Sequence, residues 1–270
     1  MPVTTIQRPV GELIRQWRER RRISQLDLSI SAEISTRHLS FVETGRANPS
    51  RDMVLRLGEH LDVPLRERNQ LLLAAGFAPA YRESRLDDPG LAVARAAVRR
   101  VLAGHEPYPA VVVDRYWNLV DSNESIAVLT EGVAPELLAA PANVLRIALH
   151  PEGMAPRVLN LGEWRADLLG RLRRQVETTA DPGLAELLAE IRAYPCDQPE
   201  TGNPERGEIF VPLRVRHGEA ELSFFSTIAT FGHPVEITLS ELAIESFYPA
   251  DDTTGEYLRQ LAASRGAAEG

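Results

Sequence analysis

Apolar positions in the first 80 residues recur every three or four places, which predicts a series of amphipathic helices. A serine precedes three of these runs, at Ser24, Ser35 and Ser50, and serine is a favoured helix N-cap. Five helices are therefore expected, over Val10–Arg22, Gln25–Ser31, Thr36–Glu43, Arg51–Leu61 and Leu65–Ala75. Five short helices in so few residues indicate a compact all-α unit.

Beyond this unit the pattern changes. An amphipathic run over Leu91–Ala103 predicts a connecting helix, which we expect to carry a signal between two domains. The alternative is that it is simply the first helix of the second domain. Short apolar runs predict strands over Pro109–Asp114, Trp117–Asp121, Glu208–Arg216, Ala220–Ala229 and Val235–Ser240. Helices are expected between them, over Glu124–Leu129, Pro135–Ala140, Asn143–Leu149, Gly162–Thr178 and Pro182–Ala193. This order indicates an α+β domain with one antiparallel sheet.

The second and third helices of the N-terminal unit are joined by only a few residues, which is the spacing of a helix-turn-helix. The third helix begins with short polar or basic side chains, which suit contacts with base edges in the major groove. Arg37 can bind a guanine through two hydrogen bonds, whereas Gln25, Arg46 and Asn48 are placed to reach phosphates. The candidate DNA-binding residues are Gln25, Ser35, Thr36, Arg37, His38, Ser40, Arg46 and Asn48.

The stretch SQLDLSISAEISTRHLSFVETGRANPS resembles the Cro-type, lambda-repressor-like helix-turn-helix of the xenobiotic-response-element regulators. The resemblance covers about residues 10–78 and implies a regulator that binds a double-stranded DNA operator. Two positions depart from the family pattern, because Ser29 replaces an alanine and Glu33 replaces the glycine of the turn. A left-handed backbone at Glu33 would cost about 1 kcal/mol relative to glycine. A helical module for dimerisation or protein binding is the alternative.

The order of strands and helices after residue 105 resembles a PAS-like sensor fold. The closer resemblance is to the MmyB-like ligand-binding domain found behind Cro-type heads. It is carried over about residues 90–250 by VVVDRYWNLVDSN, NVLRIALHPEGMAPRVLNLGEWRADLLGRLRRQ and LSFFSTIATFGHPVEITLSELAIESFYPAD. Here Glu124 and Ser125 stand where an Arg-Ala pair is usual. The resemblance implies a transcription regulator with a pocket between sheet and helices for a small apolar, fatty-acid-like ligand.

Aromatic residues of the expected strands, and polar residues near them, are the candidates for this pocket. Apolar ligand sites carry a few placed polar groups, and Arg146, Arg115 or His150 could meet a carboxylate. The candidate pocket residues are Trp117, Arg146, Leu149, His150, Phe224, Phe225 and Phe231. The alternatives are a core position for each aromatic ring, a surface role for each arginine, and a helix cap for His150.

The distribution of charge changes near residue 80, where the hydrophobic pattern also changes. The first 80 residues carry 12 Arg and 9 acidic residues, net +3, and the other 190 carry 18 Arg and 29 acidic residues, net −11. A basic head on an acidic body fits a nucleic-acid-binding head. Because one head makes few phosphate contacts, a homodimer on two half-sites is expected.

The expected organisation therefore has four parts. Residues 1–80 form the five-helix head and residues 81–105 form a linker with the connecting helix. Residues 106–250 form the PAS-like ligand-binding domain, and residues 251–270 form a C-terminal helix and tail. The fold class is an all-α helix-turn-helix domain followed by an α+β PAS-like domain with one antiparallel sheet.

Composition argues against several kinds of chemistry. All 30 basic residues are arginine, so the chain has no lysine for a Schiff base or a phosphate loop. A single cysteine, Cys196, excludes an internal disulfide and a cysteine-rich metal cluster. No two of the six histidines have ligand spacing on one helix, and no nucleophile motif is present. Glu241 and Glu245 are four apart on one helical face, which suits an acid pair, although we expect a solvated helix face. We expect no catalytic residue, no metal and no required cofactor.

Location and rival functions complete the expectations. The sequence has no run of about 18 apolar residues that would predict a membrane span. It also starts without an apolar signal segment, so a cytoplasmic protein is expected. One rival is an enzyme with a helix-turn-helix anchor. Another is a DNA-binding protein whose C-terminal domain only dimerises or binds partner proteins, which predicts a filled core without a cavity. Haem at His150 or His233, and redox sensing at Cys196, are further alternatives.

Overall fold

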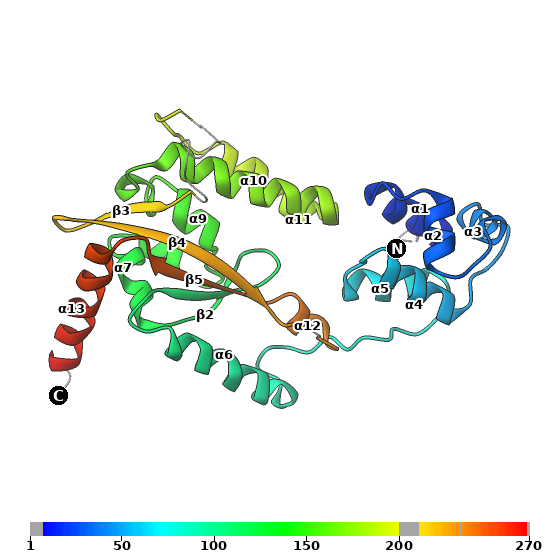
Figure 1. Ribbon diagram of the computed structural model, residues 1–270, viewed down its shortest axis with the longest axis horizontal. Coiled ribbons are helices and arrows are strands. Elements are labelled where there is room, and N and C mark those ends of the chain that lie inside the picture. The colour runs from blue at the N-terminus through cyan, green and yellow to red at the C-terminus, as the bar shows by residue number, and fades with distance from the viewer. Residues whose placement is uncertain (1–7, 200–210, 233, 269–270) are drawn as a thin grey trace, which may run out of the picture. The chain divides into compact units, whose positions relative to one another are not determined.

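The computed structural model describes residues 8–199, 211–232 and 234–268. The chain forms two compact units (Figure 1), and each has its own hydrophobic core. Unit 1 contains the residues up to Leu86 together with the segment that ends at Ser240. Unit 2 contains residues 87–232 and the chain from Glu241 onward.

Unit 1 is helical, as the apolar spacing predicts. It consists of α1 (Val10–Arg20), α2 (Gln25–Ser31), α3 (Thr36–Glu43), α4 (Arg51–His60), α5 (Leu65–Ala74) and the single turn α12 (Ile237–Ser240). The three serine caps are confirmed, because Ser24, Ser35 and Ser50 each accept the backbone N–H of the third residue on. The apolar faces meet in a core that includes Ile14, Trp17, Leu28, Leu39, Val42, Val54, Leu57, Leu71 and Leu72.

Close packing fixes α3 against α1 and α2. A Cβ on Gly11 would lie 2.0 Å from the carbonyl oxygen of Val42, so only glycine lets α1 approach α3 this closely. Glu33, in the turn between α2 and α3, has φ 53°, which is the left-handed conformation expected where the family pattern has glycine. The hydroxyl of buried Ser29 lies 2.8 Å from the hydroxyl of Thr36 and joins α2 to α3 across the turn.

Unit 2 is built on one antiparallel sheet, as predicted. Its strands are β1 (Ala110–Val113), β2 (Leu119–Ser122), β3 (Leu213–His217), β4 (Ala220–Thr230) and β5 (Ala243–Pro249). They lie in the order β2-β1-β5-β4-β3, and every neighbouring pair is antiparallel. The last strand of the chain therefore lies at the centre of the sheet, between the first hairpin and the second.

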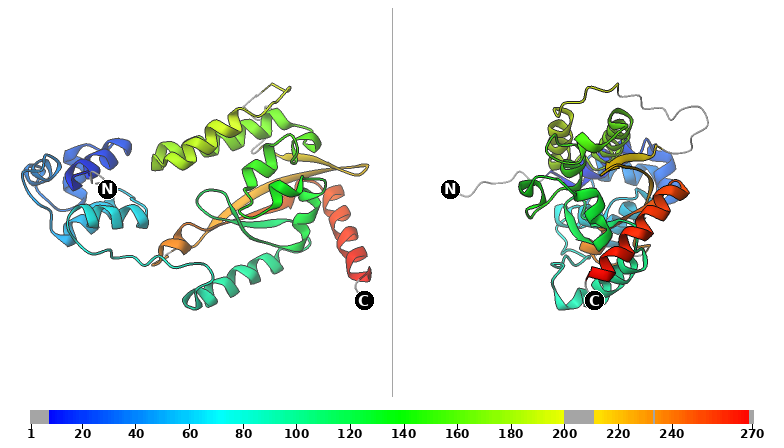
Figure 2. Two further views of the ribbon diagram at one scale, coloured as in Figure 1. Left: turned by 180° about the vertical axis from the view of Figure 1, so that it is seen from behind. Right: turned by 90° about the vertical axis from the view of Figure 1, so that its left-hand side faces the viewer.

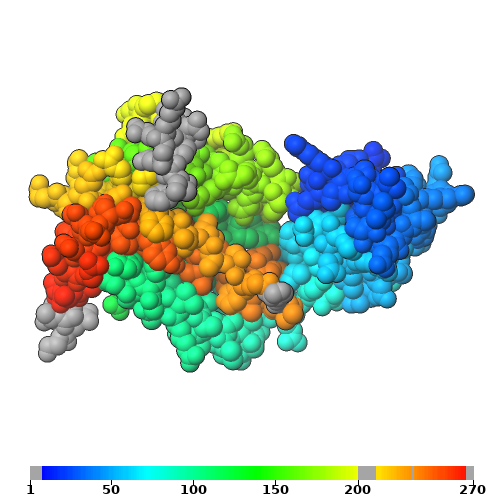
Figure 3. Space-filling model, viewed as in Figure 1, coloured from blue at the N-terminus to red at the C-terminus, as the bar shows by residue number. Residues whose placement is uncertain are grey.

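Helices flank this sheet. They are α6 (Ala92–Gly104), α7 (Ala127–Thr130), α8 (Pro135–Leu138), α9 (Val144–Leu149), α10 (Leu161–Thr179), α11 (Pro182–Arg192) and α13 (Asp252–Ala268), with one-turn 3-10 helices at Pro89–Leu91, Glu124–Ile126 and Ala155–Arg157. Figure 2 shows α10 and α11 along one side of the sheet and α6 along the opposite side. The terminal helix α13 lies beside β4 on the surface of unit 2 (Figure 3), where Thr254 accepts a hydrogen bond from the Ser223 N–H at 3.0 Å.

The expected third closing strand is wrong. Residues 237–240 form α12, and the strand that pairs with β4 is β5, which begins at Ala243. The backbone of Glu236 forms an isolated bridge with Arg82, so this stretch pairs outside the sheet. The helical interpretation of Glu241 and Glu245 is also wrong, because Glu245 lies inside β5. Strand β3 starts at Leu213, and the residues expected to begin it at Glu208 lie outside the described part of the chain.

The α12 segment, residues 235–240, is hydrogen-bonded to the end of the helical part of unit 1. The Glu236 carboxylate accepts the Ser84 N–H at 2.6 Å and the Leu239 N–H at 2.9 Å. The Ile237 N–H donates to the carbonyl of Arg82 at 2.9 Å, and the Thr238 hydroxyl donates to the carbonyl of Ser84 at 2.6 Å. A short segment from between two strands of the sheet thus belongs structurally to the helix-turn-helix unit.

Candidate functional site

Helix α3 has the shape expected of a helix that reads DNA. Leu39 and Val42 are buried and anchor one face of α3 in the core of unit 1. Arg37 is exposed near the helix start, and its guanidinium lies 5.3 Å from the centroid of the Phe41 ring. This cation–π contact holds the guanidinium beside the Phe41 ring, and the exposure of the side chain leaves its N–H donors accessible to a partner.

A buried ion pair holds the C-terminal end of α3. The Arg18 guanidinium of α1 donates to both oxygens of the Glu43 carboxylate, at 2.7 and 3.0 Å. The Gln25 side-chain amide adds a third hydrogen bond to Glu43, at 2.7 Å. The Glu43 side chain is 1% exposed, and the hydrogen bond to it raises the pKa of Arg18. One carboxylate thus ties α1 and the start of α2 to the end of α3.

The loop after α3 is held against that helix. Gly45 takes φ 72°, and the backbone N–H groups of Arg46 and Ala47 both bond to the carbonyl of Phe41, at 2.7 and 3.1 Å. This turn leaves Arg46 and Asn48 exposed, and Pro49 is buried beneath them. A basic and an amide side chain are thereby fixed close to the end of α3, where they can contact phosphates.

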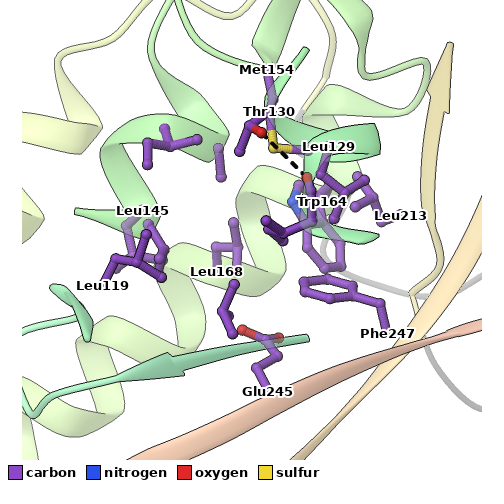
Figure 4. A pocket seen from close by; sticks show the side chains of 15 residues that line it. Leu119, Leu129, Thr130, Leu145, Met154, Trp164, Leu168, Leu213, Glu245 and Phe247 are labelled. Atoms are coloured by element: carbon purple, nitrogen blue, oxygen red, sulfur yellow. Dashed lines mark hydrogen bonds between the residues drawn. The ribbon is translucent and has the colours of Figure 1, made fainter. Parts of the chain in front are cut away.

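Unit 2 contains an apolar cavity between the sheet and the helices on one side (Figure 4). It holds about 600 Å³ of space between atoms, part of it open to solvent. Its lining is contributed by β1, β2, β3 and β5 of the sheet and by the helices around α7, α9 and α10. The lining residues are Val111, Leu119, Ile126, Leu129, Thr130, Val144, Leu145, Ile147, Ala148, Met154, Trp164, Leu168, Leu213, Glu245 and Phe247.

Three of these lining residues carry polar groups. Glu245 is 5% exposed, and its carboxylate points into the cavity beside Leu168 (Figure 4). The Trp164 indole N–H is buried and donates to no described residue. The Thr130 hydroxyl donates to the Ile126 carbonyl at 3.3 Å. Such a cavity, apolar with few polar groups, is typical of a site for a small molecule.

Two family models match the chain. A helix-turn-helix domain model matches residues 9–71, and the model of the MmyB-like transcription regulator ligand binding domain matches residues 94–261. The chain belongs to the MmyB-like transcription regulators. It is a DNA-binding regulator with a ligand-sensing domain, as its sequence implied. No curated protein matches the chain.

The DNA-binding candidates of this MmyB-like regulator lie along α3 and the loops at its ends. Ser35, Arg37, Arg46 and Asn48 are exposed, and Thr36, His38 and Ser40 are half-buried on the same helix. Gln25 lies at the start of α2, where its amide already donates to Glu43, which leaves its carbonyl oxygen for another partner. Contact of these residues with DNA stays a prediction.

The predicted pocket residues lie elsewhere in unit 2 of the regulator. None of the seven lines the cavity, whose members come instead from neighbouring positions. Leu149 and Phe224 are core residues, and Phe225 stacks on Tyr248 with ring centroids 5.2 Å apart. Trp117 has φ 66° in the β1–β2 turn and donates its indole N–H to Gln175 at 2.8 Å. Phe231 is half-buried just beyond the end of β4.

The three head-group candidates are engaged with other groups. Arg146 makes a bidentate ion pair with Glu190, at 2.8 and 2.7 Å. Arg115 pairs with Asp181 and with Glu241, the latter at 3.2 Å. His150 is the C-cap residue of α9, where its backbone N–H donates to the Arg146 carbonyl, and its Nδ1 atom accepts the Glu152 N–H at 3.1 Å.

Sequence reasoning missed Glu245 and Trp164. Strand alternation along AIESFYP would have placed Ala243, Glu245 and Phe247 on one face, and a carboxylate between two apolar side chains is a signal. The four-residue spacing of Glu241 and Glu245 favours a helical face instead and obscures this alternation. For Trp164, spacing with Leu168 along α10 indicates only a buried face, and no pattern shows that its N–H lacks a partner.

Within the described residues, the candidates for haem and redox chemistry, His150 and Cys196, each contact a neighbouring backbone group. No three His, Cys, Asp or Glu side chains in the described ranges are placed to hold a metal ion. His233 lies outside those ranges. The Cys196 thiol lies 3.6 Å from the carbonyl of Gln198. None of the described helices is long and apolar enough to cross a membrane.

Proposed function

We propose that this regulator is a one-component sensor, in which a small apolar molecule in the unit 2 cavity changes how the helix-turn-helix binds its operator. The cavity is the observation that carries the proposal, because an apolar space left between sheet and helices costs packing energy unless a ligand fills it. The rival in which unit 2 only dimerises or binds proteins predicts a filled core. The cavity therefore favours the sensor.

On the DNA side, α3 is proposed to enter the major groove. Arg37 contacts a base edge, and Arg46 and Asn48 contact the backbone of the duplex. The exposure of these side chains, and the bracing of α3 by Gly11 and the Arg18–Glu43 pair, support these roles. A homodimer on two half-sites, in the cytoplasm where the operator lies, completes the proposal.

The ligand body is proposed to be apolar, as in the fatty-acid-like class that the sequence suggested. The aliphatic and aromatic lining supports this body. Carboxylate recognition by Arg146, Arg115 or His150 has no support, because all three bond to other groups and none lines the cavity.

The route from ligand to DNA is proposed to run along β5 into the α12 segment. Glu245 lines the cavity from β5, and the α12 segment ends only five residues before it at Ser240. That segment is hydrogen-bonded to Arg82 and Ser84 in the helix-turn-helix unit. A ligand that shifts β5 would therefore pull directly on unit 1. The expected route through α6 has less support, since α6 belongs to unit 2 and buries Val98 and Leu102 there.

The test begins with the purified full chain. Native mass spectrometry, followed by solvent extraction, should show a dimer that carries an extractable apolar compound. Operator affinity is then compared with and without that compound, because a ligand acts only if it prefers one of two states. In Ala148→Phe the new ring fills the cavity, so the response should be lost while operator binding persists. A DNA response in that variant equal to the wild type would contradict the proposal.

A further inference from the structure

The cavity contains more negative than positive charge. Glu245 reaches it from β5, where its backbone is paired between Val111 of β1 and Ile228 of β4. The nearest cation is Arg171 of α10, whose guanidinium lies 3.3 Å from Glu245 Oε1. The same guanidinium lies 2.8 Å from Asp167 on its own helix. One arginine therefore serves two carboxylates, of which only Glu245 lines the cavity.

The neutral neighbours do not balance this charge. From β4, the Ser226 hydroxyl donates to Glu245 Oε1 at 2.8 Å, and from β1 the neighbour is the apolar Val111. Arg171 and Ser226 both donate to Oε1, and no described residue donates to Oε2. Burial raises the pKa of Glu245, and the nearby Asp167 carboxylate acts in the same direction. A buried carboxylate with one oxygen unused calls for a donor or a cation from the ligand.

A fatty-acid carboxylate fits poorly beside this group. Two like charges in one apolar cavity repel each other, and both lose their hydration. Among the described lining residues, the donors for a ligand anion are the Trp164 N–H and the Thr130 hydroxyl, and the latter already bonds to Ile126. One neutral N–H does not offset the burial of a second anion. The Trp164 N–H suits instead a carbonyl or ether oxygen elsewhere on a ligand.

We propose that the cavity selects an apolar amine, whose ammonium group pairs with the Glu245 carboxylate while its hydrocarbon part fills the apolar space. This deepens the proposed function and rests on it, since it names the ligand class of the same cavity. The ammonium group supplies both the missing positive charge and the missing donor to Oε2. Arg171 then remains with Asp167, so the ligand completes two ion pairs where the empty cavity has one arginine shared between two carboxylates.

The experiment compares three probes with one eight-carbon body: octylamine, 1-octanol and octanoate. Each is titrated calorimetrically into the full chain at pH 7. Octylamine should bind at least about tenfold more tightly than octanoate, with octanol between them. In Glu245→Gln, which keeps the shape and removes the charge, octylamine should lose about tenfold in affinity and octanoate should gain. Glu186→Gln, an exposed carboxylate on α11, is the matched control and should change neither.

The outcomes separate this inference from the proposed function. Octanoate that binds as tightly as octylamine, or octylamine whose affinity survives Glu245→Gln, would overturn the amine while leaving a ligand-binding sensor intact. Failure of all three probes to bind a folded wild-type chain would overturn the amine and would count against the sensor as well. If circular dichroism shows that Glu245→Gln does not fold, the order of the three probe affinities for the wild type decides whether the cavity prefers an amine.

Discussion

Arg18 and Glu43, which are 25 positions apart in sequence, form a bidentate ion pair inside the helix-turn-helix unit. The glutamate begins the run Glu43-Thr44-Gly45-Arg46 of the stretch that resembles the Cro-type helix-turn-helix. Its carboxylate fixes the end of α3 to α1. The Gly of the same motif, Gly45, then turns the chain at φ 72° toward Arg46.

Replacement of Glu43 by alanine should destabilise unit 1 strongly. It leaves the buried Arg18 guanidinium without its carboxylate, and loss of one partner of a buried pair costs about 3–5 kcal/mol. Urea unfolding of the full chain followed by circular dichroism measures the effect. Glu19→Ala removes an exposed carboxylate that pairs with Arg15 and lies 3.9 Å from Arg18, and it should lower the midpoint far less. Equal midpoints for the two variants would show that the buried pair contributes little.

A substitution in the turn of the helix-turn-helix should raise the free energy of unfolding instead of lowering it. Glu33→Gly should stabilise unit 1 by about 1 kcal/mol, because glycine adopts a left-handed backbone at no steric cost. The measurement is the same urea transition. Glu59→Gly, at an exposed helical position of α4, is the control and should destabilise the unit. A loss of stability in both variants would mean that Glu33 makes favourable contacts that outweigh its backbone strain.

The sequence predicted unit 1 well because its signals are local. Ser24, Ser35 and Ser50 each cap a helix through a residue three positions later, so the helix starts can be predicted locally. The spacing of apolar residues then indicates which face of each helix is buried. The closing strands of unit 2 depend on pairing across the fold. Val235–Ser240 has the composition of a strand, yet its hydrogen bonds go to Arg82 and Ser84, about 150 positions earlier.

The cavity could not be predicted for a related reason. Which face of β5 looks inward depends on its central place between β1 and β4, which only the tertiary fold sets. The predicted pocket residues Phe224 and Leu149 are correctly apolar and buried. They fill the core beside the cavity. A local sequence pattern distinguishes buried positions from exposed ones, but it does not distinguish a residue that lines a cavity from one that is packed in the core.

Substitutions of the two candidate DNA-binding arginines should have different effects, one on base preference and one on overall affinity. Arg37→Ala should relax base preference at one operator position and cost about 1–3 kcal/mol at the preferred base. Arg46→Ala should weaken binding to all sequences and lower the salt slope by about one. Fluorescence anisotropy on an operator and its single-base variants, at several salt concentrations, measures both. Arg173→Ala on α10 of unit 2 is the control and should change neither quantity.

The buried carboxylate of the cavity should leave a signature in stability against pH. Burial raises the pKa of Glu245 in the folded state, so folding favours its protonated form. Stability from this group is fully present below the unfolded pKa and is lost as pH rises through the folded pKa. Glu245→Gln, which cannot ionise, should therefore be more stable than the wild type at pH 7, and the gain should vanish in acid.

Urea titrations of wild type and Glu245→Gln between pH 4 and pH 8 test this sign. Arg171 and Asp167 of α10 and Ser226 of β4 surround the carboxylate, so all three stay unchanged in the comparison. Bound ligand must be removed first, because a ligand that prefers the folded chain adds its own stability. A variant that is less stable at pH 7 than in acid, relative to wild type, would mean that Arg171 outweighs the burial.

The α12 segment yields the last prediction, which concerns coupling. Glu236→Ala removes two hydrogen bonds that hold this segment to Ser84 and to its own helical turn. Each such bond to a carboxylate is worth about 1.5–3 kcal/mol, so the segment should detach from unit 1. Operator binding by α3 should then persist, whereas its response to the cavity ligand should fall. Anisotropy titrations with and without ligand give both quantities from one sample.

Two other variants decide between the routes. Glu219→Gln, an exposed carboxylate in the β3–β4 turn, should leave the ligand response intact. Ala97→Pro interrupts α6 and tests the helix first expected to carry the signal, since proline breaks the helical hydrogen-bond ladder. If Ala97→Pro abolishes the response while Glu236→Ala retains it, the signal runs through α6. The reverse result assigns it to β5 and the α12 segment, where a single carboxylate ties a strand connection to the DNA-binding unit.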